Sequence, residues 1–166
     1  MSIVLRFVAG TKIWSYGIIA LEKAAMPFTP SHVEVRMPDG ALLGARFKGG
    51  VQRQPVGYDA GEFSEELFLE LENVTGTQAA TFHAFLEDHI GEPYDWAAIG
   101  GFLVPARLHT KNHTICSALC ARALRTCKFF ATPLAAPEHL ISPRDLLVML
   151  SARQYVPMTK KGNCWV

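Results

Sequence analysis

The sequence predicts an α+β fold, because strand-like segments fill the first half of the chain and helix-like segments the second. In the first half, apolar and polar residues alternate with the period of two that a half-buried strand requires. In the second half, apolar residues recur every three or four positions, as they do on one face of a helix. No internal repeat or low-complexity linker divides the 166 residues, so a single domain over residues 1–166 is expected.

The alternating pattern predicts five strands. It is clearest in residues 31–37, where two valines and a methionine alternate with polar side chains. The Pro-Asp-Gly turn of residues 38–40 follows and predicts a hairpin with the next strand. The predicted strands cover residues 3–8, 31–37, 41–47, 51–56 and 66–72.

Helical spacing predicts helices over residues 13–25, 77–90 and 116–128, and a fourth that continues to residue 152. Ser142 is the expected N-cap of the fourth, because Pro143 and an acidic residue follow it in the first turn. Residues 94–111 are expected to form a long loop, and residues 158–166 a loose tail. His83 and His89, on the second helix, are expected to be exposed.

Charge and hydropathy exclude several classes of protein. Sixteen Lys and Arg residues against fifteen Asp and Glu give a net charge of +1, so no global basic field exists to bind nucleic acid. An apolar content of 49% excludes intrinsic disorder. No run approaches the roughly 18 apolar residues of an integral membrane segment. No signal peptide pattern is present, so a cytoplasmic chain with reduced cysteines is expected.

Cys116 and His32 are the candidates for nucleophilic catalysis. Cys116 stands at the start of a predicted helix, where the partial positive charge of the N-terminus favours a thiolate. His32 begins a predicted strand, and a histidine on a sheet can act as general base to a cysteine on a helix packed against it. On composition alone, a small buried thiol and a surface histidine remain the favoured interpretation.

A zinc site is the alternative chemistry. His109, His113, Cys116 and Cys120 are spaced four, three and four positions apart. Structural zinc sites usually draw their ligands from two separated segments, which this cluster lacks. Cys120 and Cys127 also lie on the apolar face of the predicted helix and are expected to be small buried hydrophobes.

Four short segments carry a resemblance to one enzyme superfamily. They read Ser-His-Val-Glu-Val at 31–35, Gly-Glu-Pro-Tyr-Asp-Trp at 91–96, Ile-Cys-Ser-Ala-Leu at 115–119 and Ile-Ser-Pro-Arg-Asp-Leu at 141–146. In this order, histidine before cysteine, they resemble the motifs of the circularly permuted NlpC-type cysteine peptidases and amidases. The match spans roughly residues 13–150.

The resemblance implies a papain-like fold, in which a helix starting with the cysteine packs on a small antiparallel sheet or partial barrel carrying the histidine. It implies a thiol hydrolase that cleaves an amide bond in a peptide, a cell-wall peptide or an N-acyl compound, without a cofactor. Cys116 would be the nucleophile and His32 the acid–base catalyst. Tyr94 and Ser117, with the amides at the helix start, would bind substrate or the oxyanion. A bacterial or phage source suits the family.

The chain also departs from the family pattern. The strand after the histidine offers no polar residue at the position expected to orient the imidazole. Glu34, on the same strand face as His32, is therefore the hypothesised orienting residue, with Gln52 and Gln54 as alternatives. Ala118 stands where the family often has Glu. An inactive papain-like binding module thus remains a second interpretation beside the zinc-binding domain.

Overall fold

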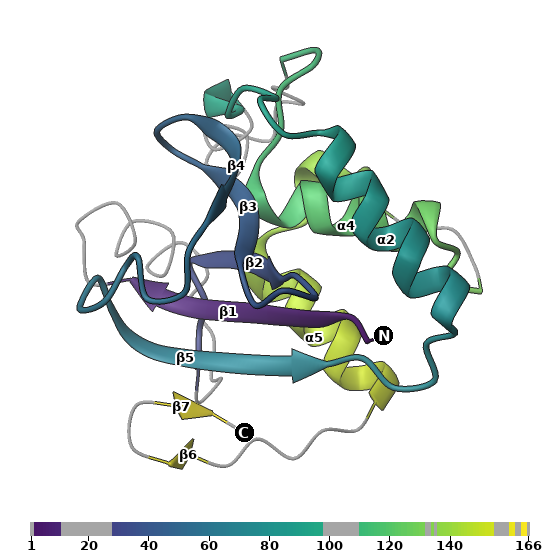
Figure 1. Cartoon of the computed structure of the whole chain (residues 1–166), viewed down its shortest axis with the longest axis horizontal. Helices are drawn as coiled ribbons and strands as arrows, with labels where there is room; N and C mark the ends of the chain where they lie inside the picture. The colour runs from purple at the N-terminus through teal and green to yellow at the C-terminus, as the bar shows by residue number, and fades with distance from the viewer. Residues whose placement is uncertain are drawn as a thin grey trace.

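The computed structural model describes residues 2–10, 28–97, 110–131, 134, 136–154, 160–161 and 164–165. They form an α+β structure, as the sequence predicts, with helices packed against one mostly antiparallel sheet (Figure 1). The five predicted strands are present as β1 (Val4–Gly10), β2 (His32–Arg36), β3 (Leu42–Arg46), β4 (Gly50–Gln54) and β5 (Phe63–Glu70). Their order in the sheet is β4-β3-β2-β1-β5, and each neighbouring pair is antiparallel.

Three of the predicted helices lie within the described residues. They are α2 (Gly76–Asp88), α4 (Cys116–Thr126) and α5 (Pro143–Gln154), and a short 3₁₀ turn, η1 (Glu138–Leu140), precedes α5. Ser142 accepts a hydrogen bond from the Asp145 amide at 3.1 Å, which confirms the predicted N-cap. The predicted helix at residues 13–25 and most of the predicted loop at 94–111 lie outside the described residues. Among the described helices, none combines the length and the hydropathy needed to cross a membrane.

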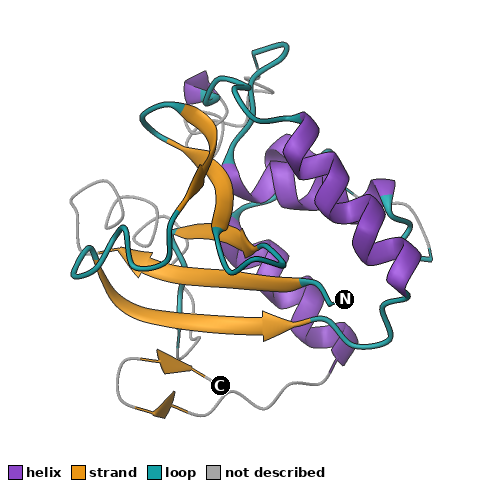
Figure 2. Ribbon diagram, in the orientation of Figure 1, coloured by secondary structure: helices purple, strands orange, loops and turns teal. Residues whose placement is uncertain are grey.

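One face of the sheet forms the core. Every second residue of the central strands points to this face and is fully buried, and Figure 2 shows the helices gathered on one side of the sheet. Leucines of α4 and α5 and the aromatic ring of Phe82 on α2 belong to the same buried cluster as these strand residues, and α4 packs against β2 and β3. Full burial of one such side chain stabilises the fold by about 1.5–3 kcal/mol. The strand residues in this cluster are Leu5, Phe7, Val33, Val35, Leu43, Ala45, Leu67 and Leu69.

Two regions differ from expectation. His83 is buried, because α2 turns the stripe formed by Ala79, Phe82, His83 and Leu86 toward the core, so the expectation that it is exposed is wrong. The expected loose tail contributes two short strands, β6 (Lys160–Lys161) and β7 (Cys164–Trp165). β7 pairs in parallel with β5 and extends the sheet at that edge.

The sheet opens between β2 and β3, and this opening positions the candidate site. β2 pairs with β1 as far as His32, whereas its pairing with β3 covers Val35 and Arg36. The β3–β4 hairpin turns away at a steep angle from β1 and β5 (Figure 1). α4 packs against both β2 and β3, so its first residue lies at the point where the two strands diverge.

Candidate active site

Cys116 is the first residue of α4 and is buried, with 4% of its surface exposed. No side chain caps this helix, since Ile115 stands at the N-cap position and makes no side-chain hydrogen bond there. The Cys116 sulfur instead accepts hydrogen bonds from the backbone amides of Val33 and Ser117. An anionic sulfur therefore occupies the place of a helix cap, at the positive end of the helix dipole.

Burial and His32 act in opposite directions on the Cys116 thiol. Burial by itself raises the pKa of a thiol, because it disfavours the charged form. The positive charge of His32, a hydrogen bond from its ring and the two backbone amides outweigh burial, so the pKa of Cys116 falls below its usual 9.0. The thiolate is thereby favoured at lower pH than in an ordinary cysteine.

His32 shows the complementary shift. Burial would lower the pKa of its imidazole, but the Cys116 thiolate and the Glu34 carboxylate raise it from 6.5 to about 10. The two shifts describe one coupled pair, in which the proton moves from the sulfur to the ring. Both shifts favour the thiolate–imidazolium form of the pair over the neutral form.

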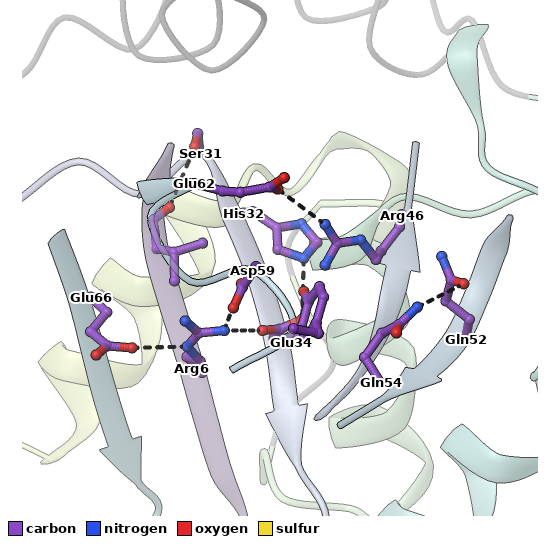
Figure 3. A network of polar contacts seen from close by, with 12 residues as sticks. Arg6, Ser31, His32, Glu34, Arg46, Gln52, Gln54, Asp59, Glu62 and Glu66 are labelled. Carbon is purple, nitrogen blue, oxygen red and sulfur yellow. Dashed lines mark hydrogen bonds and ion pairs between the residues drawn. The ribbon is translucent and has the colours of Figure 1, made fainter. Parts of the chain in front are cut away.

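Glu34 faces the other side of the His32 ring. Its Oε2 atom lies 3.6 Å from His32 Nε2, and Figure 3 shows the carboxylate between His32 and Arg6. Tyr58 donates its hydroxyl to the same Oε2 atom at 2.8 Å, and Arg6 donates to Oε1 at 2.6 Å. Burial would raise the pKa of this carboxyl, but His32 and Arg6 lower it, so Glu34 is ionised.

Gly44 provides the space for Glu34. A Cβ atom at this position of β3 would lie 2.9 Å from the Cβ of Glu34 and 3.4 Å from the carbonyl oxygen of Val33. Side chains do not approach one another this closely. Glycine at position 44 therefore leaves room for the Glu34 side chain on the neighbouring strand.

The other candidate orienting residues face elsewhere. Gln54 donates to the side chain of Gln52 at 3.0 Å, and Gln52 in turn donates to the Lys48 carbonyl at 2.6 Å. Figure 3 shows both glutamines separated from the Glu34 carboxylate. Of the three predicted orienting residues, Glu34 is therefore the one that lies next to the imidazole in the described part of the chain.

Tyr94 belongs to a segment that ties β4 to the start of α4. The Val51 amide donates to the Glu92 carbonyl at 2.8 Å, and the Thr114 amide donates to the Pro93 carbonyl at 3.0 Å. Burial, followed by the nearby charges of Cys116 and Asp95, raises the pKa of Tyr94, so the phenol is a neutral hydrogen-bond donor beside the sulfur. The structure thus brings Tyr94 close to Cys116.

Ser117 contributes to the site through its backbone. Its hydroxyl donates to the Ile141 carbonyl at 2.6 Å and fixes α4 to the segment that leads into α5. Its amide donates to the Cys116 sulfur. For an oxyanion, Ser117 therefore offers the main chain rather than the side chain.

Two residues around Glu34 were not among the sequence candidates. Arg6 lies inside a predicted apolar strand, and a buried charge in such a strand needs an ionic partner, so a signal was present. Tyr58 lies in the loop between β4 and β5, where nothing in the sequence distinguishes it. Only the fold reveals its contact, because it brings the Tyr58 hydroxyl next to Glu34 of β2, 24 positions earlier in the chain.

The remaining cysteines of α4 contrast with Cys116. Cys120 and Cys127 are buried free thiols, and burial raises the pKa of each. Of the predicted zinc ligands, His109 lies outside the described residues, and His113 contacts the Lys111 carbonyl at 3.1 Å. In the part of the chain that the structure describes, no three or more potential ligands gather around a common point.

A pocket of about 600 Å³ lies beside α4. Ile115 and Ala118 line it, whereas Cys116 does not. Its arginines are paired, Arg122 with Glu92 at 2.9 Å and Arg125 with Glu138. The pocket is therefore separate from the cysteine and the histidine.

No protein-family model, curated protein sequence or solved structure matches this chain.

Proposed function

We propose that this protein is a thiol hydrolase in which Cys116 is the nucleophile and His32 the acid–base catalyst. The observation that carries the proposal is the coupled pair at the start of α4, whose thiol pKa is lowered and whose imidazole pKa is raised. Reactive cysteines occupy such electropositive helix starts, whereas structural cysteines resemble the buried Cys120.

The reaction class that suits this pair is acyl transfer to water. The Cys116 thiolate attacks the carbonyl carbon of an amide, and the π electrons of the carbonyl move to the oxygen. As the C–N bond breaks, His32 gives its proton to the leaving nitrogen, leaving a thioester and a free amine. Neutral His32 then takes a proton from water, which attacks the thioester. The acid leaves, and the proton on His32 balances the restored thiolate.

Backbone amides at the start of α4 are available to stabilise the oxyanion. The first N–H groups of a helix have no partner within the helix, and the N-cap side chain of α4 provides none. Tyr94, a neutral phenol beside the sulfur, is a second donor for the substrate carbonyl or its flanking group.

The arrangement also supports the permuted NlpC-type, papain-like interpretation. A helix that begins with the cysteine packs against the antiparallel strands that carry the histidine. The histidine strand precedes the cysteine helix in the chain, as in the permuted order. Residues 91–96, the second motif of the resemblance, connect the sheet to the nucleophile segment.

Mapping of iodoacetamide labelling by mass spectrometry across pH tests the proposal. Cys116 should be alkylated selectively at pH 6, where an ordinary thiol with a pKa of about 8.5 is almost fully protonated. Cys120 in the same helix and Cys127 at its C-cap are internal controls. His32→Ala should remove the advantage of Cys116, whereas His89→Ala, at the end of α2, should leave it unchanged.

Equal labelling of the three helix cysteines at pH 6 would contradict the proposed hydrolase. Selective labelling that survives His32→Ala would contradict the assignment of His32. A selective and His32-dependent result justifies a screen of peptide, cell-wall peptide and N-acyl amide substrates.

A further inference from the structure

Arg6 is buried beneath the candidate site although it carries a permanent charge. Its side chain extends from β1 on the face opposite the apolar core, and 3% of its surface is exposed. The guanidinium contacts Glu34 at 2.6 Å, Asp59 at 2.9 Å and Glu66 at 3.0 Å, all as hydrogen-bonded ion pairs. The Phe63 ring covers it, with its centroid 4.5 Å from the guanidinium carbon.

The charges in this region alternate in sign along a continuous row. Cys116 is negative, His32 positive, Glu34 negative, Arg6 positive and Asp59 negative. Each member of the row therefore has an opposite charge beside it. The row holds three negative and two positive charges, so each cation lies between two anions: His32 between Cys116 and Glu34, and Arg6 between the buried Glu34 and Asp59.

The loop at residues 55–62, between β4 and β5, closes over this row. It supplies Asp59 to Arg6, and it supplies the Tyr58 hydroxyl to the Glu34 oxygen that faces His32. Arg46 of β3 stacks on the Tyr58 ring at 4.3 Å and forms an ion pair with Glu62 at 3.9 Å. These contacts fix both the position of the loop and the orientation of the Glu34 carboxylate.

We propose that Arg6 is a positioning residue of the Cys116–His32 pair, acting through Glu34, which it keeps ionised and directed at the imidazole. The inference rests on the proposed function but goes beyond it, because Arg6 touches neither the reacting sulfur nor a substrate. The reactivity of Cys116 would then depend on Arg6 of β1 and on the 55–62 loop.

The physical reason is the cost of a lone buried carboxylate. Without Arg6, only the imidazolium would hold the buried Glu34 carboxylate ionised, and burial shifts the carboxyl toward its protonated form. A neutral Glu34 no longer stabilises the imidazolium, so the proton returns from His32 to Cys116 and the thiolate is lost. Among the described residues, the ionisable groups around Glu34 come from several elements. They are His32 on its own strand, Arg6 on β1, Tyr58 and Asp59 in the loop, Glu66 on β5, Arg46 on β3 behind Tyr58, and Cys116 and Cys120 on α4.

The test compares Arg6→Lys with Arg6→Gln in the full chain, with iodoacetamide as the probe. Both substitutions lose the forked geometry of the guanidinium, but only lysine keeps the charge. In Arg6→Gln, alkylation of Cys116 at pH 6 should fall by at least about tenfold, the effect of one pKa unit. Arg6→Lys should retain most of the wild-type rate. Glu66→Gln, which removes the outer ion pair alone, is the matched control and should leave the rate unchanged.

A Glu34→Gln background separates positioning from a structural role. If Arg6 acts through Glu34, Arg6→Gln should slow alkylation in the wild-type background and add nothing in the Glu34→Gln background. Equal losses in Arg6→Lys and Arg6→Gln, or an additive loss in the double variant, would overturn the proposal. Failure of the proposed function has a different signature, namely no selective labelling of Cys116 in the wild type.

A measurement on the unmodified protein covers the case in which Arg6→Gln does not fold. A ¹³C NMR titration of the Glu34 carboxyl should show it ionised below the ordinary pKa of 4.5. In Arg6→Lys the carboxyl should stay ionised as well. Titration of wild-type Glu34 at or above 4.5 would overturn the inference.

Discussion

The two faces of β1 and β2 are both buried, yet they are built from opposite chemistry. Phe7 and Val33 point to the face that the helices cover, where apolar packing continues in every direction. Their chain neighbours Arg6 and Glu34 point to the other face, where the 55–62 loop encloses charged groups. Burial therefore contributes free energy of folding on one face and tunes reactivity on the other.

Within one strand, the residues of the apolar face thus determine stability and those of the charged face determine reactivity. On the apolar face, each side chain contributes in proportion to the area that it removes from water. On the polar face, burial is costly for every charge, and its effect is to strengthen the interactions among Arg6, Glu34, His32 and Cys116. Substitutions on the two faces should thus affect different measurements.

Phe7→Ala should have the largest effect on stability. The Phe7 ring is fully buried among helix and strand side chains, and removal of such a ring costs about 3–5 kcal/mol. The pH profile of Cys116 alkylation should be unchanged under conditions where the variant is folded. Urea unfolding followed by circular dichroism measures the loss of stability.

Phe68→Ala is the matched control for this substitution, since Phe68 lies on β5 with more than a third of its surface exposed. Its loss should cost only about 1 kcal/mol, because less apolar area returns to water. A similar cost for the two phenylalanines would show that the helix-covered face is not the main source of stability.

Gly44→Ala should have an intermediate effect and connect the two faces. The added methyl group would lie 2.9 Å from the Cβ of Glu34, so β2 and β3 must separate. We expect a loss of about 1–3 kcal/mol, typical of overpacking, together with slower alkylation of Cys116 as Glu34 moves from His32. Gly76→Ala is the matched control, because a Cβ at this position at the start of α2 would contact no other atom. This variant should lose neither stability nor alkylation rate. A normal alkylation rate in Gly44→Ala would argue against the tight placement of Glu34.

The apolar face was predictable from the sequence because alternation is a local signal. The positions of Val33 and Val35 in the period-two pattern identified β2, and the Pro-Asp-Gly turn identified the hairpin that follows. The start of α4 at Cys116 also followed from local spacing. The pairing of Cys116 with His32, 84 positions apart, came from motif resemblance rather than from any local physical rule.

The polar face was only partly predictable, because its partners come from distant segments. Glu34 could be proposed as the orienting residue, since strand alternation places it on the same face as His32. Arg6 stood out only as a charge inside an apolar strand. Neither its partner nor the contact of Tyr58 could be named, because the pairing of β1 with β2 and the path of the 55–62 loop are set by the whole fold. His83 was misplaced because a histidine in an amphipathic helix was assigned by polarity, whereas the spacing of Ala79, Phe82 and Leu86 fixes its face.

The pH dependence of stability offers the smallest but most specific test of the polar face. The raised pKa of His32 contributes stability that is fully present below pH 6.5 and lost as the pH rises through about 10. The lowered pKa of Cys116 contributes stability that is present above pH 9.0 and lost as the pH falls. With the folded pair as thiolate and imidazolium, the folded and unfolded chains would hold the same number of protons on this pair between pH 6.5 and 9, on His32 when folded and on Cys116 when unfolded.

The test compares the free energy of unfolding of the wild type with that of the double variant Cys116→Ser/His32→Gln. The difference between the two should not change with pH from pH 6.5 to 9. The subtraction cancels the titrating groups that do not interact with the pair, including the buried His83. Above pH 9 the unfolded chain loses its proton first, so the difference should fall by about 1.4 kcal/mol per pH unit until about pH 10. Below pH 6.5 the unfolded chain binds an extra proton, and the difference should fall again as the pH drops. Urea titrations at half-unit intervals measure it. A difference that does not change at any pH would mean that the folded pair is a neutral thiol and a neutral imidazole. Cys116 and His32 would then not belong to the row of alternating charges.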